Sequence, residues 1–257
     1  MTLPAGTKLG HVTLGVADVD RSATFYRDLV GLQELQRSAD SLTLGSAGVA
    51  VLHLIGEAGA KPPPRRTTGL FHTAILFPDR HALARVVKHI ATNGYAFTGA
   101  SDHLVSEAFY LDDPDGLGVE LYRDRPRAEW PFEDGALAMG TLPLDVSGVL
   151  ADADGPFDGA PDGTRVGHVH LKVSDIATAE SFYRDEIGFE ITARYGDSAT
   201  FLAADGYHHH LGTNVWQSAG ASPAPAGHAG LREFVIVAPG LAARTVVDPW
   251  GHRIQLR

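Results

Sequence analysis

The sequence contains no cysteine, and this absence removes several kinds of chemistry. Disulfides, zinc–thiolate sites, iron–sulfur clusters and thiol nucleophiles all require the cysteine side chain. Any metal must therefore be bound by His, Asp or Glu side chains or by water. The sequence also lacks the apolar run of roughly 18–20 residues that a transmembrane helix needs, and its first eight residues lack the apolar segment of a secretory signal. We therefore expect a cytoplasmic protein with no membrane partner.

Positive charge is also scarce. The 257 residues include 21 Lys and Arg against 31 Asp and Glu, which gives a net charge of −10. An acidic chain repels nucleic acid and anionic membranes, so neither is expected as a partner, and a small ligand of low charge fits better. Histidine, by contrast, is abundant at 13 residues. The rest of the sequence decides which of these histidines could converge on one site.

The chain contains an internal repeat. Residues 9–34 and 166–191 are identical at eleven of 26 positions without a gap. Each copy predicts a strand of alternating pattern, then a helix with an aspartate that can cap its start and a glycine that can end it. The two strands carry histidines at the same position of the repeat, namely His11 and His168.

Two weaker copies of this pattern begin near residues 69 and 229. The last copy runs almost directly into the turn at Asp248-Pro249-Trp250-Gly251, so we expect its helix to be missing. The four copies are called modules one to four and cover residues 9–56, 69–123, 166–217 and 229–257. We predict an α+β fold of tandem βαβββ modules in two domains. The expected segments are an N-terminal domain at 9–124, a connection rich in Pro, Gly and Asp at 125–165, and a C-terminal domain with a truncated second module at 166–257.

Residues 101–120 form the most specific motif of the chain, SDHLVSEAFYLDDPDGLGVE. Paired βαβββ modules with a histidine on the first strand resemble the vicinal oxygen chelate superfamily, which includes glyoxalase I, extradiol dioxygenases and bleomycin-resistance proteins. The motif resembles the pattern of type I extradiol ring-cleaving dioxygenases, and nearly the whole chain resembles the two-domain bacterial catechol-2,3-dioxygenase group. Only Ser101 departs from the pattern, whose matching residues are His103, Phe109, Tyr110, Asp113, Pro114, Gly116 and Glu120.

This resemblance implies an Fe(II) site, with Mn(II) as an alternative, held by two histidines and one glutamate on one face of the metal. Within module two these positions correspond to His72 and Glu120. The third ligand is either His11 or His168, and we favour His168 because module three also contains the family's stretch with an acid–base histidine, at 209–212. This choice implies that module two lies beside module three. His210 is a further alternative, as a fourth ligand.

The resemblance also implies the catalytic groups. His209 takes the acid–base role with His210 as its rival, Tyr110 hydrogen-bonds the substrate oxygen, and His103 orients both substrate and Tyr110. The expected reaction is extradiol cleavage of a catechol-type diol by O2 to a hydroxymuconic semialdehyde, and the resemblance leaves a homo-oligomer open. Two alternatives are a glyoxalase-like lyase or thiol transferase with four protein ligands and a metal-free drug-binding resistance protein. The aromatic candidates for the pocket walls are Phe109, Phe201, Tyr207 and Trp216.

Overall fold

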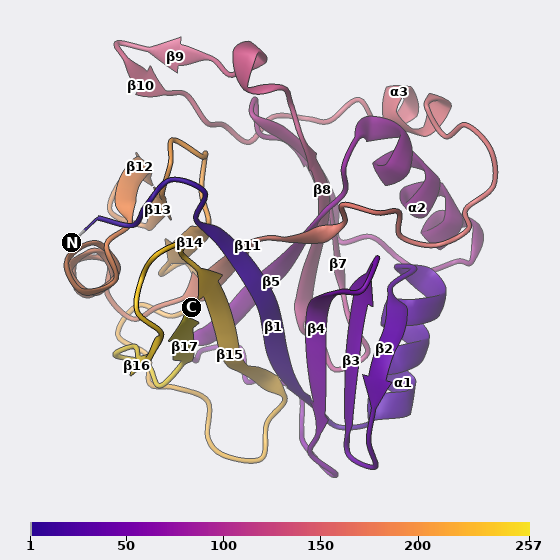
Figure 1. Ribbon diagram of the computed structural model, residues 1–257, viewed down its shortest axis with the longest axis horizontal. Coiled ribbons are helices and arrows are strands. Elements are labelled where there is room, and N and C mark those ends of the chain that lie inside the picture. The colour runs from indigo at the N-terminus through magenta and orange to yellow at the C-terminus, as the bar shows by residue number, and fades with distance from the viewer. Residues whose placement is uncertain (1) are drawn as a thin grey trace.

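The computed structural model describes residues 2–257, and its strands form two large sheets (Figure 1). The strands of the first sheet are β1 (Lys8–Val16), β2 (Gln33–Arg37), β3 (Ser41–Ser46), β4 (Val49–Gly56), β15 (Gly230–Val237), β16 (Arg244–Val247) and β17 (Arg253–Leu256). They lie in the order β16-β17-β15-β1-β4-β3-β2. This sheet therefore combines module four with module one.

The second sheet has eight strands and combines module three with module two. Its strands are β5 (Gly69–Leu76), β6 (Gly99–Asp102), β7 (Ser106–Asp112), β8 (Gly118–Asp124), β11 (Arg165–Lys172), β12 (Glu190–Tyr195), β13 (Ala199–Ala203) and β14 (Leu211–Asn214). They lie in the order β12-β13-β14-β11-β5-β8-β7-β6. The predicted neighbourhood of modules two and three is thus confirmed, whereas the domain limits at residues 124 and 166 stay a prediction.

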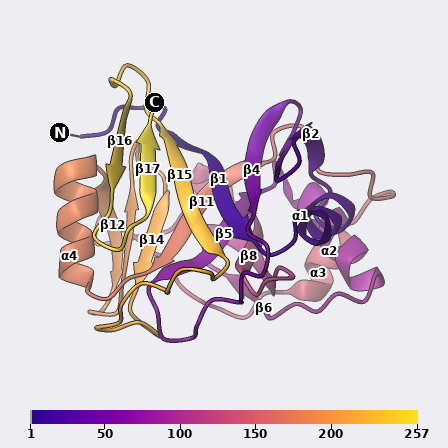
Figure 2. The ribbon, with the colours of Figure 1, turned by 90° about the horizontal axis from the view of Figure 1, so that it is seen from below.

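The helices form where the repeat predicts them. Asp18 and Asp175 accept hydrogen bonds from the first turns of two equivalent helices, and Asp79 caps a third. Gly31 and Gly188 follow the equivalent helices with φ angles of +89° and +103°, a conformation that favours glycine. Figure 2 shows α4 on one flank of the molecule and α1 and α2 on the opposite flank. The helices are α1 (Val19–Ala23), continued as a wider turn η1 (Thr24–Leu29), α2 (Arg80–Thr92), and α4 (Ile176–Glu180), continued as η3 (Ser181–Ile187).

Module four carries no helix between β15 and β16 in the part of the chain described, as its short sequence predicts. Buried apolar side chains of all four modules merge into one large cluster between the sheets and their helices. No helix within residues 2–257 is long and apolar enough to cross a membrane.

The connection between β8 and β11 is ordered and packs on the second sheet. It contains η2 (Arg127–Glu129), a small hairpin of β9 (Phe132–Glu133) and β10 (Ala136–Leu137), and α3 (Val146–Ala151). Trp130 is buried and its ring lies 6.0 Å from that of Tyr207. Backbone hydrogen bonds join Leu142 to Asp102 at the edge of the sheet. These contacts bring residues 139–141 close to the motif at residues 101–120.

Candidate metal centre and active site

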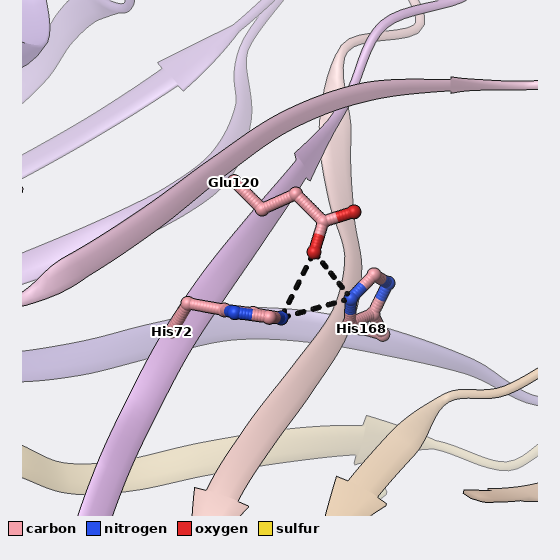
Figure 3. A group of neighbouring side chains, drawn as sticks. All are labelled: His72, Glu120 and His168. Atoms are coloured by element: carbon pink, nitrogen blue, oxygen red, sulfur yellow. Dashed lines mark hydrogen bonds and ion pairs between the residues drawn. The ribbon is translucent and has the colours of Figure 1, made fainter. Parts of the chain in front are cut away.

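Three potential metal ligands converge in the second sheet (Figure 3). The Nε2 atom of His72 lies 2.9 Å from Oε2 of Glu120, and Nε2 of His168 lies 3.1 Å from the same oxygen. The two Nε2 atoms are 3.3 Å apart. Donor atoms at right angles around an ion, each about 2.1 Å from it, would be about 3 Å apart. The donor set and its spacing therefore fit a divalent metal held on one face.

Strand register explains why these side chains meet. Strand β5 lies between β11 and β8, and its Ala74 pairs with His168 on one side and with Glu120 on the other. His72 precedes Ala74 by two residues, so the two share one face of the sheet. The small Ala74 side chain leaves room for the larger neighbours to turn toward each other. The three ligands thus surround an alanine on adjacent strands.

The electrostatics of the cluster favour metal-binding protonation states. Burial alone would raise the pKa of Glu120, but His168 and His72 beside it hold that pKa well below its usual value. Burial lowers the pKa of His168 to about 4. At neutral pH the site therefore presents an ionised carboxylate and a neutral imidazole, which are the forms that bind metal.

A cavity of about 410 Å³ lies over this cluster. Among the residues that line it there is no lysine or arginine, and Asp112 is the one carboxylate besides Glu120. Of the four aromatic candidates for its walls, Phe201 and Trp216 line it. The other two candidates lie elsewhere, Phe109 in the apolar core and Tyr207 against Trp130. The apolar part of the lining includes Phe71, Leu111, Val119 and Met139.

Tyr110 and His103 form a hydrogen-bonded pair at the cavity wall. Nδ1 of His103 lies 2.7 Å from the carbonyl oxygen of Gly140, and its Nε2 lies 2.6 Å from the Tyr110 hydroxyl. A carbonyl only accepts, so Nδ1 carries the hydrogen, and Nε2 of the neutral ring accepts from Tyr110. Burial and the nearby Glu120 raise the pKa of Tyr110 well above its usual value. Tyr110 is therefore a protonated phenol at neutral pH.

The histidine tract at 208–210 separates into different environments. His209 lines the cavity, and its ring centroid is 4.1 Å from that of His168. His210 faces away from the cavity, where its Nδ1 accepts a hydrogen bond from the Ala204 amide and its ring stacks on Phe189. His208 is fully buried behind His209. Of the two candidates for the acid–base role, His209 lines the cavity and His210 does not.

The two alternative metal ligands lie outside the cluster. Across residues 2–257, the group of donor atoms close enough to share a metal consists of His72, Glu120 and His168. His11 lies in the first sheet, on β1, with its ring 6.4 Å from that of His53. His210 is turned toward Ala204. The structure therefore brings His72, Glu120 and His168 together, and it places neither His11 nor His210 beside them.

The sequence did not assign several of the cavity residues to the site. His170 lines the cavity beside His72, and its Nε2 is 3.0 Å from the amide nitrogen of Asn214. Burial lowers the pKa of His170 well below its usual value, so its ring is neutral. His170 stands two residues beyond His168 and so shares its strand face, and this spacing is a signal that could have assigned it to the site. Met139, Gly140 and Thr141 come from the connection, whose irregular sequence gives no such signal.

Solved structures share this fold. A putative dioxygenase from Bacillus subtilis subsp. subtilis str. 168 superposes with a TM-score of 0.62 at 15% identity, covering 97% of this chain and 84% of its own. Glyoxalase I from Zea mays gives a TM-score of 0.60 at 18% identity, covering 98% of this chain and 92% of its own. At these identities the likeness concerns the fold, and it confirms the predicted α+β arrangement of tandem modules.

Sequence comparison identifies the family. A protein named catechol-2,3-dioxygenase from Bacillus subtilis (strain 168) is 40% identical over 238 residues, which cover 91% of this chain and 83% of that protein. Residues 8–121 match the family described as Glyoxalase/Bleomycin resistance protein/Dioxygenase superfamily. The chain therefore belongs to the glyoxalase/bleomycin resistance protein/dioxygenase superfamily.

Proposed function

We propose that this protein cleaves the ring of a catechol-type diol with O2 at an Fe(II) site, in the extradiol manner. The observation that carries the proposal is the cluster of His72, Glu120 and His168 at an apolar cavity that also contains Tyr110 and His209. The name of the 40% identical relative supports it. Both oxygen atoms of O2 enter the product, and the ring bond next to the diol breaks to give a hydroxymuconic semialdehyde.

His72, Glu120 and His168 would hold the iron through two Nε2 atoms and one carboxylate oxygen. Two neutral imidazoles and one carboxylate leave positive charge on a divalent ion, and a face-bound ligand set leaves positions open for a chelating diol and for O2. Bound Fe(II) would supply a centre for electron exchange with O2 and would favour the ionised form of the diol. Mn(II) suits the same donor set.

The chain's own groups would orient the substrate and hold its protons. The Tyr110 hydroxyl donates to His103 and faces the cavity, where its oxygen would accept a hydrogen bond from a diol hydroxyl. His209 lies on the other side of the cluster, against His168, where its imidazole would receive a proton from the diol and return it during ring opening. Because Gly140 fixes His103, the connecting segment takes part in this arrangement.

The cavity lining favours an uncharged ring. Phe71, Phe201 and Trp216 offer aromatic faces, and no lysine or arginine of the lining could pair with a substrate carboxylate. A carboxylated catechol would also meet the acidic Asp112. We therefore assign catechol and alkyl- or aryl-substituted catechols as the substrate class.

Reconstitution of the enzyme tests the proposal. The protein is loaded with Fe(II) without air, mixed with catechol, 3-methylcatechol, 4-methylcatechol or 2,3-dihydroxybiphenyl, and then exposed to O2. We expect a yellow semialdehyde and consumption of one O2 per product, and no product from protein loaded with Zn(II). Conversion of methylglyoxal and a thiol without O2 would instead support a glyoxalase-like activity and contradict the proposal. Absence of ring cleavage with stoichiometric iron bound would also contradict it.

A further inference from the structure

A row of hydrogen-bonded side chains lies behind His209, on the side away from the cavity. Nε2 of His208 is 2.8 Å from Oδ1 of Asp124, at the end of β8. Nδ1 of His208 is 2.8 Å from Nδ1 of His209. His209 therefore contacts the cavity with one edge of its ring and His208 with the other.

Asp124 is fixed from a second direction. The Tyr207 hydroxyl donates to Asp124 at 2.9 Å, and the Tyr122 hydroxyl is 2.9 Å from that of Tyr207. The His208 ring is enclosed by Tyr207, whose centroid is 4.0 Å away, and by Trp130, at 5.3 Å. In this enclosed orientation both nitrogens of His208 have a hydrogen-bond partner.

Hydrogen-bond chemistry then specifies the positions of the ring hydrogens. An ionised carboxylate can only accept, so Nε2 of His208 carries a hydrogen toward Asp124. In a neutral ring the other nitrogen is an acceptor, so Nδ1 of His208 must receive its hydrogen from Nδ1 of His209. His209 is then neutral with its hydrogen on Nδ1, which is the less common form of histidine in water.

We infer that Asp124 and His208 are positioning residues that hold His209 in its Nδ1–H tautomer and present the bare Nε2 atom to the cavity. Nε2 of His209 makes no hydrogen bond to another described residue. It is also not one of the fully buried side-chain atoms that lack a partner, so it is accessible from the cavity. A diol hydroxyl can therefore donate to it and pass it a proton, while Nδ1–H stays bonded to His208. This catalytic consequence rests on the proposed function, but the tautomer itself does not.

The tautomer is measurable in the metal-free protein. Two-bond ¹⁵N–¹H correlation spectra of histidine-labelled protein distinguish Nδ1–H from Nε2–H rings, and the His209 signal is assigned by its loss in His209→Gln. We expect the Nδ1–H pattern for His209 and the Nε2–H pattern for His208. An Nε2–H pattern for His209, or a doubly protonated His208 that donates to it, would overturn the inference without any kinetic measurement.

A pair of variants separates positioning from packing. His208→Leu removes the acceptor, so His209 should shift toward the Nε2–H form. His208→Asn places an amide oxygen near the former Nδ1 position, so the Nδ1–H form should remain. In the iron-loaded enzyme, kcat should fall about 10- to 100-fold in His208→Leu and recover to within about threefold of wild type in His208→Asn. KM for catechol and iron content should stay within about twofold in both.

The outcomes also separate this inference from the proposed function. If His209 has the same tautomer, and the enzyme the same kcat, in His208→Leu as in wild type, the positioning role of His208 is overturned. A wild-type protein with the Nδ1–H form of His209 but no ring cleavage would refute the proposed reaction and leave the tautomer assignment intact. If His208→Leu fails to fold, the wild-type spectrum and His208→Asn still decide the question.

Discussion

His72 and His168 are 96 residues apart in the chain, yet their Nε2 atoms lie 3.3 Å from each other. The antiparallel pairing of β5 with β11 brings them together, so each half of the chain contributes one of these histidines. The contact therefore depends on the association of module two with module three. His11 occupies the same position of the repeat as His168 but lies in the other sheet.

The first prediction compares these two equivalent histidines. His168→Ala should lower iron affinity by more than about 100-fold, because it removes one of the three protein ligands. Loss of a residue that only hydrogen-bonds a ligand typically lowers metal affinity by about 10- to 100-fold, and loss of the ligand itself should lower it further. His11→Ala is the matched control and should keep stoichiometric iron and activity. Metal analysis after dialysis against a weak chelator measures both. Iron loss in His11→Ala with retention in His168→Ala would move the site to the other module.

The local features of the repeat were predictable because short-range rules determine them. The capping aspartates Asp18 and Asp175 and the helix-ending glycines follow from the sequence alone. The pairing of whole modules does not, since His11 and His168 stand in nearly identical local sequence. Resemblance to a family favoured His168, and the strand order then grouped it with His72 and Glu120.

The remaining parts of the site had no periodic pattern to reveal them. Gly140 reaches His103 from an irregular connection, so no strand or helix periodicity predicts the contact. The bond between His208 and His209 joins neighbours whose side chains would face opposite ways in a strand. The tract precedes β14 and is not itself a strand, which allows the two rings to meet.

The second prediction concerns the Tyr110 hydroxyl. Tyr110→Phe keeps the ring and its packing but removes the group that donates to His103 and faces the cavity. We expect unchanged iron content and a fall in kcat of about 10- to 1000-fold, since the hydroxyl would act mainly near the transition state. Steady-state kinetics with catechol provide the measurement. An unaltered kcat would show that Tyr110 serves only to pack the cavity wall.

The third prediction uses two adjacent histidines as variant and control. His209→Gln should retain iron and bind catechol, because His209 is outside the ligand trio, but ring cleavage should slow by about 100-fold or more. His210→Gln should change kcat by less than about threefold, since His210 faces Ala204. Single-turnover measurements with preformed catechol complex separate binding from cleavage. A larger loss in His210→Gln than in His209→Gln would reverse the two assignments.

The fourth prediction concerns two carboxyls at equivalent turns of the repeat. Tyr26 donates to Asp113 at 3.1 Å, and Tyr183 donates to Asp248 at 2.7 Å. Burial raises the pKa of Asp113 from 3.8 to about 6. Burial acts in the same direction on Asp248, but His252, whose Nδ1 is 2.8 Å away, holds the pKa of Asp248 below its usual value. Equivalent positions should therefore respond to pH in opposite ways.

A raised carboxyl pKa means that the folded state binds its proton before the unfolded state does. As pH falls from about 6 toward 3.8, Asp113 therefore adds stability, up to about 3 kcal/mol for a shift of this size. Asp248 has the opposite sign: its contribution is present above pH 3.8 and is lost as pH falls through its lowered pKa. Urea unfolding of wild type and Asp113→Asn at pH 7, 6 and 5 isolates the first effect. The wild type should gain stability relative to Asp113→Asn by about 1–2 kcal/mol between pH 7 and pH 5, whereas a constant difference would show that Asp113 titrates alike in both states.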